Sequence, residues 1–269
     1  MSAGAAGIPS IRSFGLARAD QLKLRRRRGL FWTVTVLTIV PMVIAYGVLA
    51  ILHAANPDHH GPAGGVENLG HGMFVLTLLG GVAAILAGAR AGADDVASGV
   101  FRELVVTGRP RVALFGALIP GGLAFVLPFA ACGYGLAAIA ATAAPQYLPA
   151  PFATLLLEAG LWVLVEIAFY FVLSLGVASV INSRAYTIGV LLAWRMAVGP
   201  ILASIGALGI YRAAVPDVDF DRMAPGALNE YVTGGTGVGV SRGVSVLVLL
   251  LWAAAAAGAG AWRTATRDA

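Results

Sequence analysis

Six long apolar segments, separated by short polar joints, restrict the possible folds of this sequence more than any other feature. They lie at about 31–52, 70–90, 112–142, 152–181, 186–210 and 243–262. The hydrocarbon core of a bilayer is roughly 30 Å thick and takes ~20 residues of helix, so each segment is long enough to cross it. The sequence therefore predicts an all-α membrane protein, with six transmembrane helices in a single domain that covers residues 1–269.

The composition excludes a water-soluble globular protein. Hydrophobic residues make up 59% of the 269 residues, only 12% are charged, and the mean hydropathy is +0.85. Soluble domains contain about a quarter charged residues. A folded chain of this size still exposes much of its surface, so this much apolar area needs the bilayer as its solvent.

The basic residues predict the orientation of the six segments. Fourteen Lys and Arg residues fall on the side of the N-terminus, and three fall on the other side, all in 211–242. The fourteen lie in residues 1–30, in residues 90–111, and at Arg184, Arg263 and Arg267. Cytoplasmic loops carry the excess of Lys and Arg, so we expect both termini in the cytoplasm.

The net charge of +5 then reflects membrane topology and contact with anionic lipid headgroups. We expect no nucleic-acid partner, because a soluble basic face with aromatic residues is missing from the sequence. Arg outnumbers Lys by seventeen to one and Ala and Gly are abundant, which indicates a GC-rich bacterial genome. The expected location is the inner (plasma) membrane of a bacterial cell.

Residues before the first apolar segment show a helical pattern. Four apolar residues recur at roughly helical spacing among three basic ones: Ile11, Phe14, Ala17 and Leu22, with Arg12, Arg18 and Lys23. A helix with one apolar and one basic face lies flat in the membrane interface. We therefore predict an N-terminal amphipathic helix on the inner leaflet, followed by the basic run Arg25–Arg28, which anchors the first transmembrane helix.

Three ionisable residues fall inside the apolar segments: Glu158, Glu166 and Arg195. Charge in the hydrocarbon core costs at least ~2.5 kcal/mol, so such residues usually face a partner or a cavity. Glu166 and Arg195 lie in neighbouring segments joined by a tight hairpin, within roughly 10 Å of each other in depth. Glu158 lies closer to the outer surface. Two interpretations remain open: a polar lining on a substrate path, or a structural ion pair that holds two helices together.

Other candidate sites carry weaker patterns. Four histidines and two carboxylates gather in or near the first outer loop: His53, His59, His60, His71, Asp58 and Glu67. Their spacing matches no established metal motif, so we expect no metal site. The stretch TGGTGVGVSRG at 233–243 lacks the lysine and the preceding strand of a phosphate-binding loop, so we expect no cofactor on this chain. The single cysteine, Cys132, excludes an internal disulfide.

A short charged joint, DDVASGVFRELVVTGRPR, follows the second apolar segment. It predicts a cytoplasmic helix over 94–108. Asp94 or Asp95 is in place to cap the first turn, because a carboxylate accepts hydrogen bonds from unpaired amides there. Gly108 suits the C-terminal cap, and Pro110 forbids continuation. One face of this helix is apolar and carries Val96, Val100, Leu104 and Thr107, with Phe101 beside them. The opposite face is charged and carries Asp95, Arg102 and Glu103, and Val106 is the exception to the pattern.

This joint resembles that of the ABC-2 type transporter permease family. Members have six spans and a short cytoplasmic helix between the second and third, followed by a G-T-x-x-x-L-L-x-T-P-x-x-R-like sequence. The chain supplies five matching residues: Gly99, Leu104, Val105, Thr107 and Arg111. It differs at Val100, where the family usually has Thr, and at Gly108, where the family usually has Pro.

The resemblance implies a transport subunit rather than an enzyme. The chain is then one half of an export channel for an amphipathic or hydrophobic substrate, such as a drug, an antibiotic or a lipid-like molecule. Its partners are a second permease copy or a paralogue, membrane lipids and a separate ABC ATPase, which binds ATP and Mg. The coupling helix that the ATPase pushes comprises Asp94, Asp95, Gly99, Phe101, Arg102, Glu103, Leu104, Thr107 and Arg111. Arg102 and Glu103 are the expected contacts with the ATPase.

Two alternatives remain. A membrane-embedded enzyme needs a catalytic set at one membrane face, but the sequence contains neither H-E-x-x-H nor the spaced aspartates of CDP-alcohol transferases. A membrane scaffold or assembly protein needs no motif, and fold-level analogy does not separate it from a permease.

Overall fold

The computed structural model describes residues 9–232 and 239–267, and these residues form helices joined by turns, without a strand. Six helices are long and apolar enough to cross a membrane, as predicted. They are α2 (Arg28–Thr38) continued by α3 (Val40–Ala55), α4 (Val66–Ala97), α6 (Arg111–Ala143), α7 (Ala153–Ile181), α8 (Arg184–Ala193) continued to Ser204, and α12 (Arg242–Thr266). The chain is therefore a multi-pass membrane protein with an all-helical fold.

The first and fifth spans differ from the prediction. The first is interrupted at Ile39, because Pro41 has no N–H to donate to the turn before it, and the helix restarts at Val40. The fifth ends at Ser204 rather than near residue 210. Within it a π-helical turn, η1 (Trp194–Val198), separates α8 from α9 (Gly199–Ser204).

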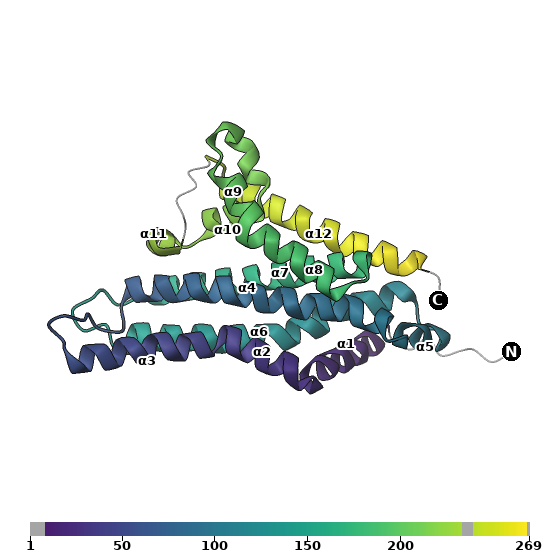
Figure 1. The fold of residues 1–269 in the computed structure, drawn as a ribbon, viewed down its shortest axis with the longest axis horizontal. Helices are drawn as coiled ribbons and strands as arrows, with labels where there is room; N and C mark the ends of the chain where they lie inside the picture. The colour runs from purple at the N-terminus through teal and green to yellow at the C-terminus, as the bar shows by residue number, and fades with distance from the viewer. Residues whose placement is uncertain (1–8, 233–238, 268–269) are drawn as a thin grey trace.

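The elongated bundle is built around the pair formed by α4 and α7, with α2, α3 and α6 on one side and α8 and α12 on the other (Figure 1). Small residues allow the two central helices to lie close together. A Cβ atom at Gly88 would meet the carbonyl of Phe171, and one at Gly92 would meet the carbonyl of Leu175. Helices in membranes associate through such small residues, because there the backbones approach closely.

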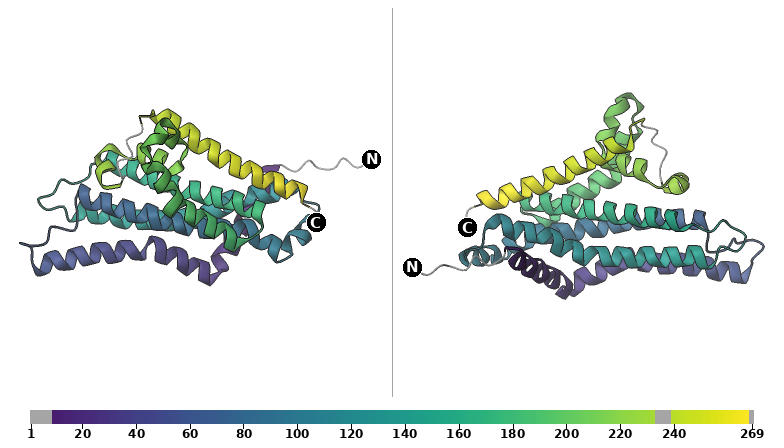
Figure 2. Two further views of the ribbon diagram at one scale, coloured as in Figure 1. Left: turned by 45° about the horizontal axis from the view of Figure 1, so that its top comes forward. Right: turned by 180° about the vertical axis from the view of Figure 1, so that it is seen from behind.

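The bundle has two distinct ends (Figures 1 and 2). The start of α1 (Pro9–Arg26), the short helix α5 (Val100–Val106) and Arg267 lie together at one end, which we call the terminal end. The loops at 56–65 and 144–152 lie at the opposite end, which we call the loop end. Six crossings require both described chain ends to lie on one side, as they do.

The segment between the fifth and sixth spans folds into short helices. These are η2 (Gly206–Ala214), α10 (Pro216–Met223), η3 (Gly226–Leu228) and α11 (Asn229–Val232). Tyr231 of α11 packs against Gly70, close to the start of α4. The segment therefore covers the half of the bundle nearer the loop end.

Candidate functional site

The predicted coupling helix is shorter than expected and begins later. Asp94 and Asp95 do not cap it: they belong to the last turns of α4, which continues to Ala97. The residue that precedes α5 is Gly99, in the left-handed region with φ of 78°, and no side chain caps the helix. The chain turns at this glycine, because few other residues adopt that conformation without strain.

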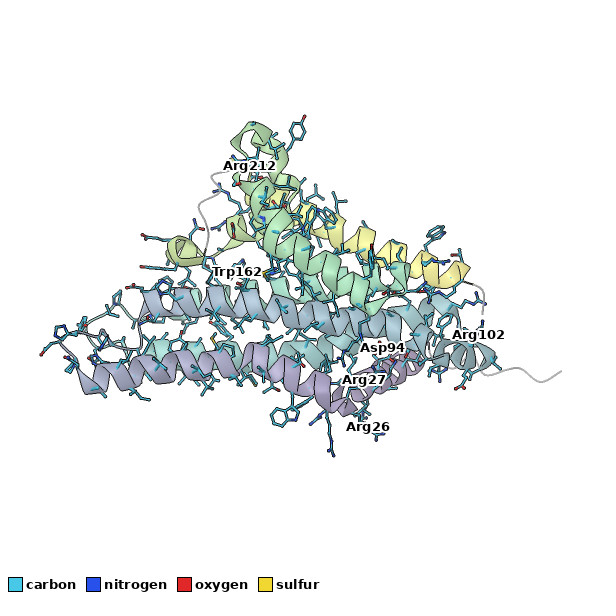
Figure 3. All side chains as sticks on the ribbon, viewed as in Figure 1. Arg26, Arg27, Asp94, Arg102, Trp162 and Arg212 are labelled. Atoms are coloured by element: carbon cyan, nitrogen blue, oxygen red, sulfur yellow. The ribbon has the colours of Figure 1, made fainter. Side chains whose placement is uncertain are left out.

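The two aspartates instead hold α4 to the residues before the first span. Asp95 pairs with Lys23 of α1, and Asp94 pairs with Arg27, which lies in the break between α1 and α2 (Figure 3). Arg184, at the start of α8, lies 3.9 Å from Asp94. These basic partners neutralise both carboxylates, so α4 extends through them.

A helix does form at Pro9–Arg26, and it lies along α6. Leu24 is buried, whereas Arg25 and Arg26 are exposed (Figure 3). The side chains of Ile11 and Phe14 lie outside the part of the chain whose side chains are described. The amphipathic character of this helix and its place on the inner leaflet therefore stay predictions.

Helix α5 has one buried anchor and an exposed outer face. Phe101 is 7% exposed, whereas Val106 is 86% exposed. Arg102 and Glu103 are exposed as well, and Figure 3 shows Arg102 at the terminal end. Gly108 ends the helix as predicted, with φ of 77° and its N–H donating to the carbonyl of Val105.

Helix α6 starts at Arg111, directly after Pro110 and one residue before the predicted start of the third span at 112. Arg109 and Pro110, which lie between Gly108 and the start of α6, are exposed. Only four residues, 107–110, connect α5 to the third span, and Gly108 is the one of them with a positive φ.

Arg267 connects several helices at the terminal end, a role that could not be predicted from the sequence. Its guanidinium donates to the carbonyl of Ser179 (2.7 Å) and to the side chain of Asn182, and its carbonyl accepts from Arg111. The same guanidinium lies 5.7 Å from the ring of Phe101. One side chain after the last span thus contacts the α7–α8 turn and α5.

A cavity of about 210 Å³ lies beneath α5, lined in part by Asp20, Asp95, Phe101 and Arg267. Burial raises the pKa of the Asp20 carboxyl to about 6; the negative charge of Asp95 adds to the rise and Lys23 opposes it. The junction of α1, α4 and α5 is therefore polar and incompletely filled.

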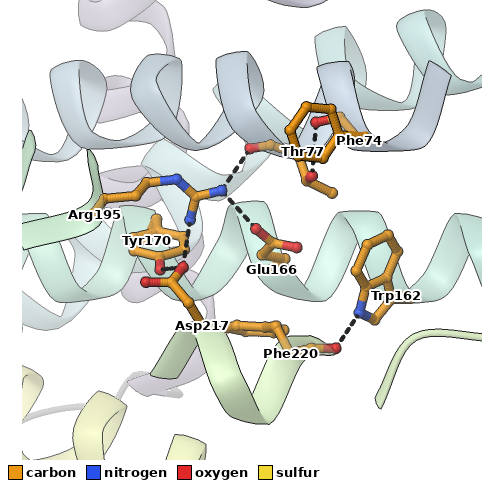
Figure 4. Close-up of polar contacts among 8 residues, drawn as sticks. All are labelled: Phe74, Thr77, Trp162, Glu166, Tyr170, Arg195, Asp217 and Phe220. Carbon is orange, nitrogen blue, oxygen red and sulfur yellow. Dashed lines mark hydrogen bonds and ion pairs between the residues drawn. The ribbon is translucent and has the colours of Figure 1, made fainter. Parts of the chain in front are cut away.

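The second group of site residues lies within the bundle. Arg195 and Glu166 form a buried ion pair with 2.7 Å between Nη2 and Oε1, which confirms their predicted proximity (Figure 4). Arg195 belongs to the π-helical turn η1. Its guanidinium also donates to the carbonyl of Thr77 in α4 (2.9 Å) and lies 4.0 Å from the centre of the Tyr170 ring. Such a turn is a frequent feature of functional sites.

A third charge joins this pair from outside the predicted spans. Oδ1 of Asp217 in α10 lies 3.4 Å from Nη1 of Arg195. The same oxygen accepts a hydrogen bond of 2.5 Å from the hydroxyl of Tyr170 (Figure 4). Asp217 could not be predicted from the sequence, because a carboxylate in a polar joint has no periodic pattern to place it. We call these four residues, Tyr170, Glu166, Arg195 and Asp217, the charged cluster.

A cavity of about 520 Å³ opens beside the charged cluster. Its walls come from α4, α7, η1, α9, η2 and α10, and we call it the cluster cavity. Among its lining residues are Phe74, Trp162, Glu166, Arg195, Asp217 and Asp221. Glu166 and Arg195 therefore form an ion pair and also line a cavity, so the two interpretations left open by the sequence are compatible. Glu158 is exposed and does not line this cavity.

The remaining candidate residues do not assemble into a site. His53 contacts the carbonyl of His60 and the side chain of Gln146, whereas His71 lies edge-to-face against the ring of Tyr231. Within 9–232 and 239–267 no three His, Cys, Asp or Glu side chains are placed to share a metal ion. Of the glycine-rich stretch at 233–243, residues 233–238 lie outside the described residues.

No protein-family model matches this chain, and no curated protein matches it either. The geometry of the terminal end and of the charged cluster, together with the resemblance of the joint at 94–111, is therefore the basis for a functional proposal.

Proposed function

We propose that this chain is the permease subunit of an ABC transporter, which exports an amphipathic or hydrophobic substrate and is powered by a separate ATPase subunit that holds ATP and Mg. The observation that carries the proposal is α5, a discrete helix between the second and third spans. It has one buried anchor, Phe101, and an outer face that exposes Arg102, Glu103 and Val106.

The outer face of α5 suits a protein partner. Among the described residues Arg102 and Glu103 form no ion pair, so both charges are available. Val106, the last residue of the helix, is also exposed and adds an apolar side chain. Protein interfaces combine such an apolar centre with charged residues at the rim, which set orientation and partner choice.

The inner face of α5 suits the transfer of a displacement to the spans. Phe101 and the guanidinium of Arg267 join the helix to the ends of α7 and α12, and Gly99 and Gly108 give the chain a turn on each side. A push on α5 therefore reaches α4 through Gly99 and α6 through Arg111. In this proposal α5 is the coupling helix.

The cluster cavity lies nearer the other end of the bundle and supplies polar groups within the membrane-spanning part. Ionisable residues there are costly and mark substrate or ion paths in many membrane proteins. We infer that the terminal end faces the cytoplasm of a bacterial cell, and that the pathway is completed by a second permease copy or a paralogue.

The test is ATP hydrolysis by the complex. The tagged chain is purified from its native membranes, the associated proteins are identified, and the complex is reconstituted in liposomes. We expect a P-loop ATPase to co-purify. Arg102→Glu together with Glu103→Arg should lower the coupled ATPase rate at least tenfold, whereas the control Arg18→Glu, at an exposed position of α1, should leave it unchanged. Transport by a preparation without any ATPase would contradict the proposal.

A further inference from the structure

The cluster cavity contains more negative than positive charge. Three carboxylates line it, from Glu166, Asp217 and Asp221, against two guanidinium groups, from Arg195 and Arg212. Arg195 is engaged with Glu166 at 2.7 Å and with Asp217 at 3.4 Å. Arg212 donates to the backbone carbonyls of Gly209 and Ala203. The cavity thus presents one carboxylate more than its guanidinium groups balance.

The unbalanced carboxylate is Asp221, one helical turn beyond Asp217 on α10. Within the described part of the chain it forms no ion pair, and no hydrogen bond to its side chain is seen. In an α-helix, residues four apart lie on the same face. Both carboxylates accordingly line the same cavity from one helix.

Two atoms of the charged cluster are buried without a hydrogen-bond partner among the described residues. They are Oδ2 of Asp217 and Nε of Arg195, a residue that is 7% exposed. Buried polar atoms are nearly always paired, so these two atoms leave the charged cluster incompletely satisfied. The unpaired carboxylate oxygen of Asp217 adds to the negative charge beside the cavity.

Aromatic rings form the apolar part of the wall. Phe74 of α4 is 48% exposed, and Trp162 of α7 is held in place because its indole N–H donates to the carbonyl of Phe220 (3.0 Å; Figure 4). The faces of Trp and Phe rings attract cations through their quadrupole, and most strongly where water is excluded. Carboxylates and ring faces in one cavity favour a ligand with a positive charge on an apolar body.

We propose that the cluster cavity binds an amphipathic organic cation, whose charge lies beside Asp217 and Asp221 and whose apolar part lies against Phe74 and Trp162. The cavity volume of about 520 Å³ falls in the usual range of small-molecule sites. The identification of the cluster cavity as the substrate site of an exporter rests on the proposed function, whereas the binding of an organic cation to this cavity does not.

The same geometry makes binding depend on pH. Burial raises the pKa of Asp221 to about 7; Glu166 of α7 and Asp217 of α10 add to the rise, and Arg195 of η1 opposes it. Arg212 of η2 is the other charged group that lines this cavity. A proton and an organic cation therefore compete for Asp221, and the proton is bound below about pH 7.

The experiment measures binding of radiolabelled tetraphenylphosphonium to the purified full-length chain in detergent, without an ATPase. We expect Asp221→Asn to weaken binding at least tenfold. The matched control is Glu230→Gln, which removes one carboxylate from an exposed position in α11 of the same segment and should leave the affinity unchanged. Phe74→Leu keeps an apolar side chain but removes the ring face, and should weaken binding severalfold.

Two further measurements separate this site from nonspecific uptake by the detergent. Lowering the pH from 8 to 6 should weaken binding to the unmodified chain about tenfold, because protonation of a group with a pKa near 7 costs one decade per pH unit below it. The affinity of the Asp221→Asn variant should not change over that range. Tetraphenylborate, an anion of the same shape, should not displace the cation.

Three results would overturn the proposal: equal affinity in the Asp221→Asn variant, displacement by tetraphenylborate as effective as by unlabelled cation, or pH-independent binding to the unmodified chain. Failure here is distinguishable from failure of the proposed function. Asp221-dependent cation binding by a chain with which no ATPase co-purifies from native membranes would refute only the transporter, and an active ATPase complex whose cation affinity does not depend on Asp221 would refute only the cation site.

Discussion

Replacing Arg195 by Met should destabilise the protein more than any other single change in the charged cluster. The guanidinium is buried, pairs with Glu166 at 2.7 Å and Asp217 at 3.4 Å, and donates to the carbonyl of Thr77. Met fills a similar volume but leaves two carboxylates without their counter-charge. Removing one partner of a buried ion pair typically costs about 3–5 kcal/mol of unfolding free energy.

The assay is reversible unfolding of the purified chain in mixed micelles of detergent and dodecyl sulfate, followed by tryptophan fluorescence. The combined variant Glu166→Gln with Arg195→Met should be more stable than Arg195→Met alone, because it removes one of the uncompensated charges. Glu158→Gln serves as a matched control, since it makes the same change at an exposed position of the same helix and should leave stability unchanged. An Arg195→Met variant within about 0.5 kcal/mol of the unmodified chain would show that the buried ion pairs of Arg195 do not stabilise the fold.

Two further predictions concern the terminal end. Replacing Asp94 and Asp95 by Asn should lower the unfolding free energy by about 1 kcal/mol, because two partly exposed ion pairs with Arg27 and Lys23 are lost. Salt screens such pairs, so the difference should shrink in 0.5 M NaCl, and an undiminished difference would contradict the assignment. Gly108→Ala should cost about 1–2 kcal/mol, since its φ of 77° disfavours a side chain. Gly116→Ala, on α6 with open space around the new methyl group, is its control, and equal stability of the two variants would show that Gly108 is not conformationally required.

Much of the fold follows from the sequence because each span is a local feature. Apolar length predicts a crossing helix whatever its neighbours are, so all six were found. The proximity of Glu166 and Arg195 was also predictable, since a tight hairpin fixes the relative depth of its two helices. Gly108 and Arg111 were placed correctly, because a glycine followed by a proline ends a helix through backbone chemistry alone.

What escaped prediction depends on contacts between distant segments. Asp94 and Asp95 look like helix caps locally, but Arg27 and Lys23 stabilise them inside α4. Asp217 reaches Arg195 only because the joint after the fifth span folds back onto the bundle.

The role of Arg267 escaped for a different reason. After the last span the sequence shows only a basic residue, and such a residue satisfies the positive-inside rule without any specific contact. Its bonds to Ser179 and Asn182 and its position near Phe101 exist only once α7 and α12 lie side by side.

The most direct test of the central claim asks whether α5 touches an ATPase. Cys132 is the single cysteine, so Cys132→Ala provides a background in which Val106→Cys, on the exposed face of α5, is the one reactive thiol. Cells that express this variant are treated with a short photoactivatable thiol cross-linker, and the adduct is identified by mass spectrometry. We expect a cross-link to a P-loop ATPase at Val106→Cys and none at a control thiol at Ile139, which is exposed on α6 within the span. Efficient labelling of Val106→Cys without any ATPase adduct, in cells whose transport activity is intact, would contradict it.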